Sequence, residues 1–530
     1  MRRCLLLIML ISCTALFAQE RSNPFAVRPD PNAEVTFTNP VIPGFYSDPS
    51  VCRVGDDYYL ITSTFEYFPG VPIFHSKDLV NWEQIGHCIH RNEQLPKGVN
   101  IFAATLRHYD GKFYMITTNM GGNRGNFYVT ATDPAGPWSD PIFIKGLPGI
   151  DPDLFWDDDG KAYVISSPFI LFEIDLETGE LLSEGRKVWS TTGGRYAEAP
   201  HIYKKDGFYY LMAAEGGTEE AHSETIARSH NIWGPYYSNP ANPILAHANA
   251  AGQGNPIQGV GHADMIEAHD GSWWIVFHGY RTVALLAHHT LGRETCLAPV
   301  SWPKNAWPVV NGNGTATVEM TCPTLPLIPF KEKDPKVDFT KDKLGLEWNY
   351  IQLPEEGNYS LKPEEGSLVL RGSGLKIGDR GSPTFVGRRL QHMHFTTSTQ
   401  LDFDPVHENE EAGFILLNNN SHFDVMISRR GSERYLQVRL QFGLTTYKSE
   451  EIKLTAGPVK LKIEGKKSTF TFSYAQGDSD YTDIEAVDAK YLSSETVGGF
   501  TGVYVGLYAT GNGKASEAAA TYDWFEYQAK

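Results

Sequence analysis

The chain of 530 residues is too long for a single hydrophobic core, so we expect two or three domains. Its composition, with 41% hydrophobic, 12% aromatic and 21% charged residues, is ordinary for a soluble globular protein. The net charge of −17 argues against nucleic acid as a partner, because phosphate binding needs basic patches, whereas a neutral polysaccharide is indifferent to that charge.

The N-terminus has the layout of a secretory signal peptide. Two arginines precede a largely apolar run over residues 5–17, which is too short to span a membrane. We expect cleavage after Ala18, so that residues 1–18 form the signal peptide. A lipoprotein processing site, with Cys13 as the lipidated residue, is the alternative. Either route predicts a secreted or periplasmic protein, and no later stretch of the sequence predicts a membrane span.

Four cysteines remain after that cleavage, namely Cys52, Cys88, Cys296 and Cys322. They are far apart and contain no CxxC pair, so they do not match the spacing of a zinc site. Buried free thiols are the preferred interpretation, although a disulfide can form in an oxidising compartment.

A self-similar unit recurs about every 50 residues in the first part of the mature chain. Each copy consists of a short strand, a turn marked by an aspartate and an aromatic-rich strand. In four copies the turn reads Asp-Gly, which is typical of a β-hairpin. The turn aspartates are Asp56, Asp110, Asp159, Asp206 and Asp270. Five such units predict a five-bladed β-propeller over residues 39–327, because single blades must stack in a ring to bury their faces.

The C-terminal part of the sequence has a different pattern. A proline-rich stretch over residues 323–335 predicts a linker. Beyond it the fivefold motif is absent, but strand-like runs continue, for example over residues 367–370 and 413–417. This pattern predicts a β-sandwich of two antiparallel sheets over residues 337–530. The predicted fold class is therefore all-β.

One position of the repeat gathers reactive side chains. The residues eight positions before the turn aspartates are Asp48, Phe102, Asp151, Glu198 and His262. Equivalent positions of propeller blades face one another across the axis, so we expect these side chains to point into one end of the channel. A single aspartate at a strand start is often only a turn residue bonded to its own backbone, but three carboxylates at one repeat position favour a shared site.

Three carboxylates in a concave pocket fit glycoside hydrolysis. That reaction needs a carboxylic acid to protonate the leaving oxygen and a carboxylate to activate water or to attack. Like charges held close together keep one carboxyl group protonated near neutral pH, and a third group can orient the acid. The same carboxylates and histidine could instead hold a cation such as calcium. Spacing alone does not assign the roles.

Five segments of the mature chain carry recognisable motifs, over residues 40–50, 150–155, 197–201, 261–264 and 291–295. In this order they resemble the motifs of glycoside hydrolase family 43, in its β-xylosidase and α-L-arabinofuranosidase branch. The resemblance spans nearly the whole mature chain. It implies a five-bladed propeller followed by a concanavalin A-like sandwich.

The resemblance implies a role for each carboxylate. Asp48 would be the general base that activates water, and Glu198 the general acid. Asp151 would hold Glu198 in place and raise its pKa. The family inverts configuration in a single displacement, so acid and base should flank the sugar with room for water. No cofactor is required, although a structural calcium ion could occupy the channel.

The resemblance also implies substrate-binding residues. Arg293 would bind sugar hydroxyls, and His262 would lie deep in the channel near a water or cation. Phe65 would wall the pocket, and Phe102 would stack on a sugar face. Phe500 would close the pocket from a glycine-rich loop of the second domain.

Together these features predict an exo-acting inverting glycosidase that releases terminal α-L-arabinofuranosyl or β-D-xylosyl units from oligosaccharides or polysaccharides of plant hemicellulose. Two departures from the family pattern favour arabinofuranosidase slightly over β-xylosidase: residues 102–104 replace Trp-Ala-Pro, and Ala199 replaces glycine. A non-catalytic glycan-binding protein is one alternative, supported by the altered residues 102–104. A retaining fructan-cleaving propeller is another, but residues 198–200 do not resemble its acid motif.

Overall fold

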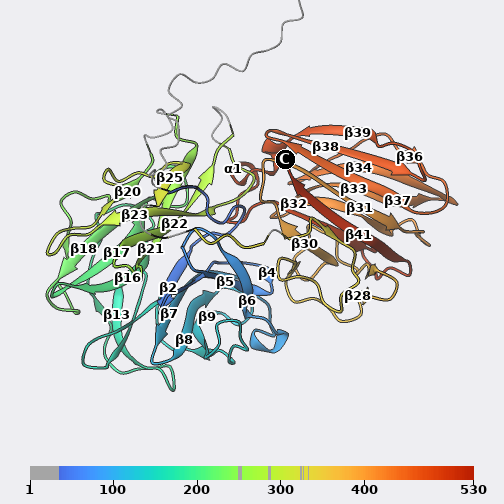
Figure 1. Cartoon of the computed structure of the whole chain (residues 1–530). Coiled ribbons are helices and arrows are strands. Elements are labelled where there is room, and N and C mark those ends of the chain that lie inside the picture. The colour runs from blue at the N-terminus through green and yellow to red at the C-terminus, as the bar shows by residue number, and fades with distance from the viewer. Residues whose placement is uncertain (1–34, 249–253, 284–287, 323–324, 326, 332) are drawn as a thin grey trace, which may run out of the picture.

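The computed structural model describes residues 35–248, 254–283, 288–322, 325, 327–331 and 333–530. Strands dominate these residues, and they form five small sheets arranged as a propeller, followed by a two-sheet sandwich (Figure 1). The predicted all-β fold is thus confirmed. The predicted signal peptide and Cys13 lie outside the described residues, as does part of the predicted linker. Among the described helices, none is long and apolar enough to cross a membrane.

Each blade is an antiparallel sheet that follows chain order. Blade 1 contains β2 (Ser50–Val54), β3 (Asp57–Ile61), β5 (Gly70–Ser76) and β6 (Glu83–Ile89), and blade 2 contains β7 (Ile101–Tyr109), β8 (Lys112–Asn119), β9 (Gly125–Ala131) and β10 (Ile142–Phe143). Blade 3 contains β11 (Asp153–Trp156), β12 (Ala162–Ser166), β13 (Ile170–Asp175), β14 (Glu180–Leu181) and β15 (Arg186–Lys187). Blade 4 contains β16 (Glu198–Lys205), β17 (Phe208–Glu215), β18 (Ser223–Ser229), β19 (Tyr237–Ser238) and β20 (Leu245–Ala246). Blade 5 contains β21 (Ile257–Glu267), β22 (Trp273–Arg281), β23 (Glu294–Ser301) and β24 (Val309–Val310). The first strands of neighbouring blades contact one another and therefore line the channel.

The predicted turn chemistry explains the hairpins between the first two strands of the blades. Asp110 and Gly111 join β7 to β8 with φ values of 49° and 73°. Asp206 and Gly207 join β16 to β17 with φ values of 52° and 78°. Two consecutive residues with positive φ match the right-handed twist of a tight hairpin, and Asp-Gly adopts this conformation at low cost.

The ring is closed by the N-terminal segment of the propeller. Strand β1 (Val35–Thr38) pairs with β25 (Glu319–Cys322). The Asn39 side chain then donates to the carbonyl oxygen of Leu297 in β23 at 2.9 Å. This arrangement joins the two ends of the propeller next to blade 5.

The C-terminal domain consists of two packed sheets around a separate hydrophobic core. The first sheet contains β26 (Lys336–Val337), β28 (Tyr359–Lys362), β29 (Ser367–Arg371), β31 (His394–Asp402), β37 (Val459–Lys466), β38 (Thr469–Gln476), β39 (Thr482–Asp488) and β41 (Ala519–Ala529). The second contains β27 (Asn349–Ile351), β30 (Phe385–Arg389), β32 (Glu411–Asn418), β33 (Ser421–Arg430), β34 (Glu433–Phe442), β35 (Thr445–Lys448), β36 (Ile452–Lys453) and β40 (Tyr504–Thr510). A short helix, α1 (Ser494–Val497), precedes β40.

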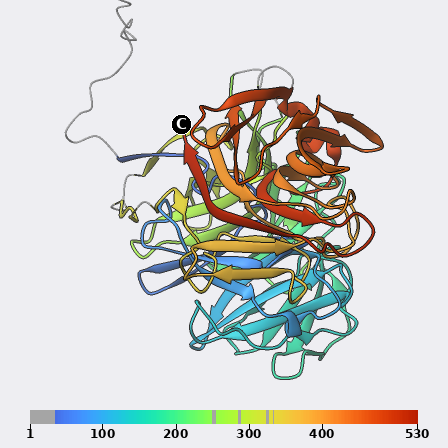
Figure 2. The same ribbon diagram turned by 90° about the vertical axis from the view of Figure 1, so that its right-hand side faces the viewer.

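The sandwich lies directly against the propeller (Figure 2). Strand β4 (Tyr67–Phe68) leaves blade 1 and pairs with β27, so it forms the last strand of the second sandwich sheet. The Tyr67 ring stacks on Tyr504 of β40, with centroids 3.8 Å apart. A buried cluster with residues from both domains surrounds this contact. The two domains are therefore joined by backbone pairing as well as by apolar packing.

Three of the four cysteines that remain in the predicted mature chain are buried free thiols, namely Cys52, Cys88 and Cys296. Burial raises the pKa of each thiol, so they are packing residues rather than reactive ones. The side chain of Cys322 lies outside the described residues.

Candidate active site

The inner strands carry backbone irregularities where the predicted site residues lie. Asp48, Asp151 and His262 have φ values of 56°, 53° and 50°, a left-handed conformation that is uncommon outside glycine. His262 lies within β21 rather than at its start, at a shift in the pairing register between Gly261 and Asp264. Such conformations cost free energy and concentrate at functional sites. Three of the five repeat positions therefore share an unusual backbone conformation as well as reactive side chains.

Asp48 lies at the centre of the site and is almost fully buried. Its Oδ1 atom is 2.7 Å from Nη1 of Arg293 and 2.9 Å from Nδ1 of His278. Its Oδ2 atom accepts hydrogen bonds from the hydroxyl groups of Ser47 and Ser63. Burial raises the pKa of Asp48, but Arg293 and the neighbouring histidines hold it well below its usual range. Asp48 is therefore a carboxylate that can accept a proton.

His262 lies between two carboxylates. Its Nδ1 atom is 3.7 Å from Oδ1 of Asp48 and 3.6 Å from Oε1 of Glu198. Burial lowers the pKa of His262, but the negative charges of Asp48, Glu198 and Asp151 outweigh burial and raise it to about 9. A protonated imidazole thus separates the two carboxylates and offsets part of their repulsion.

Asp151 and Glu198 influence one another electrostatically. Asp151 is buried, and its Oδ2 atom accepts the N–H of Ala199 at 3.4 Å, so it contacts the backbone next to Glu198. Burial together with the charges of Glu198 and Asp48 raises the pKa of Asp151 to about 7. Burial also raises the pKa of Glu198, but His222 and His262 more than reverse this and lower it. Near neutral pH Asp151 therefore holds a proton more readily than Glu198, and Glu198 must gain a proton before it can act as an acid.

The protonation of Asp151 and Glu198 sets the expected pH dependence. Because this pair must hold a proton for acid catalysis, kcat/KM should fall as the pH rises through about 7, the pKa of Asp151. Asp48 stays ionised down to well below pH 4, so it should not limit activity on the acidic side. Rates measured from pH 4 to 9 test this expectation. A profile that is flat between pH 6 and 8 would contradict it.

Three phenylalanines form a cluster beside Arg293. The Phe65 ring is 5.2 Å from Phe102 and 5.5 Å from Phe500, measured between centroids. The Arg293 guanidinium lies 5.8 Å from the Phe500 ring, and its Nη2 atom donates to the Phe500 carbonyl oxygen at 3.3 Å. The structure therefore brings a sandwich residue, Phe500, to the two propeller phenylalanines and to the arginine that binds Asp48.

Two glycines allow this loop of the sandwich to approach the propeller. A Cβ atom on Gly502 would lie 2.3 Å from the carbonyl oxygen of Leu291, and one on Gly292 would lie 2.9 Å from Gly502. Both distances are shorter than side chains tolerate, so the loops touch backbone to backbone. Beside this contact is a cavity of about 960 Å³, lined by Arg293, Phe500, Gln258 and Tyr280 among others.

The residues that sequence reasoning missed are two buried histidines. His278, on β22, contacts Asp48, and its Nε2 atom is 3.1 Å from Nδ1 of His222. The Nε2 atom of His222 is in turn 3.7 Å from Oε1 of Glu198. Neither histidine occupies the repeat position, so the repeat gives no signal for them. They form a row of imidazoles from the Asp48 carboxylate to the Glu198 carboxylate.

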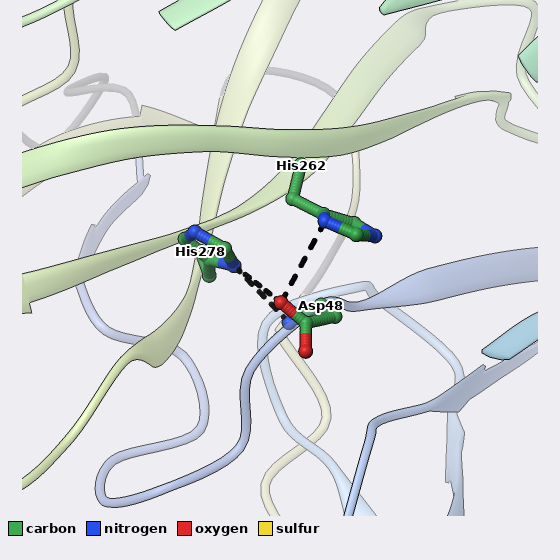
Figure 3. A group of neighbouring side chains, drawn as sticks. All are labelled: Asp48, His262 and His278. Carbon is green, nitrogen blue, oxygen red and sulfur yellow. Dashed lines mark hydrogen bonds and ion pairs between the residues drawn. The ribbon is translucent and has the colours of Figure 1, made fainter. Parts of the chain in front are cut away.

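Among the described residues, Asp48, His262 and His278 form a group whose ligand atoms lie within 4.8 Å of one another (Figure 3). Calcium prefers six to eight oxygen ligands, whereas this group offers one carboxylate and two imidazoles. The carboxylate already binds Arg293, and the raised pKa of His262 favours its protonated form, which cannot ligate a metal. These donors do not fit calcium, and we derive no step through a cation.

Comparison with known proteins supports the geometry. The family model described as glycosyl hydrolases family 43 matches residues 37–308, and the one described as beta xylosidase C-terminal concanavalin A-like domain matches residues 336–528. A non-reducing end alpha-L-arabinofuranosidase of Bacteroides ovatus is 43% identical over 511 residues, covering 94% of this chain and 95% of that protein. A xylosidase/arabinosidase of Butyrivibrio fibrisolvens is 37% identical over 521 residues, with 93% and 99% coverage.

Solved structures of similar enzymes have the same fold as this chain. The structure described as Bacteroides ovatus xyloglucan PUL GH43B superposes with a TM-score of 0.89 at 41% identity, covering 94% of this chain and 100% of that chain. A xylan beta-1,4-xylosidase from Bacillus halodurans superposes with a TM-score of 0.87 at 32% identity, with 93% and 100% coverage. The family that the motifs predicted is thus confirmed. The chain belongs to glycosyl hydrolases family 43 and is a glycosidase.

Proposed function

We propose that this protein is an exo-acting, inverting hydrolase that releases terminal α-L-arabinofuranosyl units from a hemicellulose, with β-D-xylosyl units as the second substrate. The observation that carries the proposal is the grouping of Asp48, Asp151 and Glu198 at one end of the channel, next to a cluster of phenylalanines that packs on Arg293. A pocket of this kind admits a chain end or a side-chain sugar, whereas an internal segment of a polymer needs an open cleft. The pocket requires no cofactor for this reaction.

The proposed reaction is a single displacement. Asp48 removes a proton from a water molecule, whose oxygen attacks the anomeric carbon as the glycosidic C–O bond breaks. Glu198 donates a proton to the departing oxygen, and the neighbouring Asp151, whose pKa is raised to about 7, is the source from which Glu198 is protonated. Asp48 and Glu198 each lie within 3.7 Å of the same His262 nitrogen, so the base and the acid belong to one compact site. Arg293 keeps Asp48 ionised and can donate to sugar hydroxyls.

The preference for arabinofuranose is supported by two observations. The Bacteroides ovatus relative is an alpha-L-arabinofuranosidase by name, and its identity of 43% exceeds the 32% of the Bacillus subtilis beta-xylosidase. The chain also departs from the pattern of many β-xylosidases at residues 102–104 and at Ala199. The description of the Bacteroides ovatus structure points to arabinosylated xyloglucan as a candidate polysaccharide.

Hydrolysis of 4-nitrophenyl α-L-arabinofuranoside and 4-nitrophenyl β-D-xyloside tests the proposal. We expect a higher kcat/KM on the arabinofuranoside, with NMR showing that the first sugar released has the opposite anomeric configuration. Retained configuration would contradict the mechanism and favour a nucleophilic carboxylate. If neither glycoside nor arabinosylated xyloglucan is cleaved, a glycan-binding protein becomes the better description.

A further inference from the structure

A single buried arginine joins all five blades inside the channel. Arg107 extends from β7 of blade 2, and its Nη1 atom is 2.7 Å from Oδ2 of Asp264 on blade 5. Its Nε atom is 2.9 Å from Oδ1 of Asp153 on blade 3, and its Nη2 atom is 3.0 Å from Nδ1 of His201 on blade 4. The Ser50 hydroxyl of blade 1 lies 3.4 Å from Nη1. One planar guanidinium therefore contacts the inner strands of the four other blades.

Each partner of Arg107 follows one of the predicted site residues in the chain by two or three positions. We call those site residues, Asp48, Asp151, Glu198 and His262, the catalytic layer. The pairs are Ser50 with Asp48, Asp153 with Asp151, His201 with Glu198, and Asp264 with His262. A shift of one blade at the level of the arginine therefore also shifts its catalytic side chain. Small displacements of this kind are costly, because acid, base and sugar must be aligned closely for reaction.

The charges and hydrogen bonds around Arg107 favour one arrangement of the inner strands relative to one another. The side chains of Asp153 and Asp264 are fully buried, so each needs the cation. The Ser50 hydroxyl donates to Asp264 at 2.7 Å and accepts the N–H of Leu106 at 3.0 Å. An arginine can satisfy several acceptors in one plane, whereas a lysine is a point charge that cannot.

The arginine also marks the floor of the catalytic pocket. A second cavity, of about 350 Å³, opens at the other end of the channel and is lined by residues from all five inner strands. Arg107 lines this cavity together with Tyr109, Trp156, Tyr203 and Glu267. Because the inner strands run from the catalytic layer toward this cavity, the arginine and its partners lie between the two and separate them.

We propose that Arg107 is a positioning residue that fixes the separation of the Asp48 and Glu198 carboxylates by holding the five inner strands in register. This inference rests on the proposed function. Arg107 does not touch the sugar, so its removal should affect the chemical step more than substrate binding.

The test is the conservative variant Arg107→Lys, which keeps the charge but loses the multiple contacts. We expect kcat on 4-nitrophenyl α-L-arabinofuranoside to fall by about 10- to 100-fold. KM should stay within about twofold of wild type, because no group that contacts the sugar is removed. Ser50→Ala, which removes only the blade 1 link, should lower kcat by about threefold.

Arg439→Lys in the sandwich is the matched control. Arg439 binds Asp424 at 3.0 Å and Glu411 at 2.8 Å, and its side chain is 14% exposed against 16% for Arg107. This control should lose thermal stability but keep the wild-type kcat. The proposal is overturned if Arg107→Lys and Ser50→Ala both keep the wild-type kcat. If Arg107→Lys does not fold, a wild-type kcat in Ser50→Ala overturns it. Activity of the wild type, and its loss in Glu198→Ala, tests the proposed function separately.

Discussion

Replacing Asp48 by asparagine is expected to lower kcat by about 10²- to 10⁴-fold, the range for loss of a positioned general base. The amide cannot take a proton from water. It also leaves the buried guanidinium of Arg293 without the anion at 2.7 Å that balances its charge. The loss should be similar for a 4-nitrophenyl glycoside and for a natural oligosaccharide, because both reactions need the same activated water.

The control for this variant is Asp110→Asn. Asp110 is an exposed turn residue of blade 2, and asparagine tolerates its positive φ. Its kcat should equal that of the wild type. If Asp48→Asn kept more than about a tenth of the wild-type kcat, the general base would have to be another residue.

Replacing Glu198 by alanine should have an effect that depends on the leaving group. A 4-nitrophenolate ion departs with little help from an acid, so we expect kcat to fall by about 10²-fold on the aryl glycoside. A sugar alcohol is a much poorer leaving group, and the loss on an arabinosylated oligosaccharide should approach about 10⁴-fold. The decline of activity above pH 7 should also disappear on the aryl glycoside, because no acid remains to lose its proton.

Parallel assays of Glu198→Ala on the two substrates measure this difference. Glu267→Ala is the control, since Glu267 is an exposed carboxylate at the far end of β21. Equal losses on both substrates would rule out Glu198 as the proton donor. Asp151, with its pKa raised to about 7, would then be the next candidate.

The propeller and the grouping of its carboxylates could be predicted because both depend on a local repeat. Turn residues such as Asp110 and Gly111 fix each hairpin within a few residues, and the repeat places Asp48 and Asp151 at equivalent positions. The predicted two-domain fold is confirmed, and the structure brings Asp48 and Glu198 together around His262. Their chemical roles stay predictions.

The parts that could not be predicted depend on contacts between distant segments. His222 and His278 are outside the repeat position, and only the ring of blades brings them to Glu198 and Asp48. The proton distribution in the Asp151 and Glu198 pair follows from those histidines, so sequence spacing cannot supply it. Strand β4 has only two residues, which is too short for a periodic pattern. The sequence therefore does not predict its pairing with β27.

The pairing of β4 with β27 has a consequence for synthesis of the chain. The ribosome completes all five blades, including Asp48 and Glu198, before it makes the strand that pairs with Tyr67. Phe500, which packs against Phe65, is added later still. A nascent or truncated propeller therefore holds the acid and the base in a pocket with one side open to water. The sandwich residues are therefore the last part of the aromatic cluster to be made, after the propeller that carries the acid and the base.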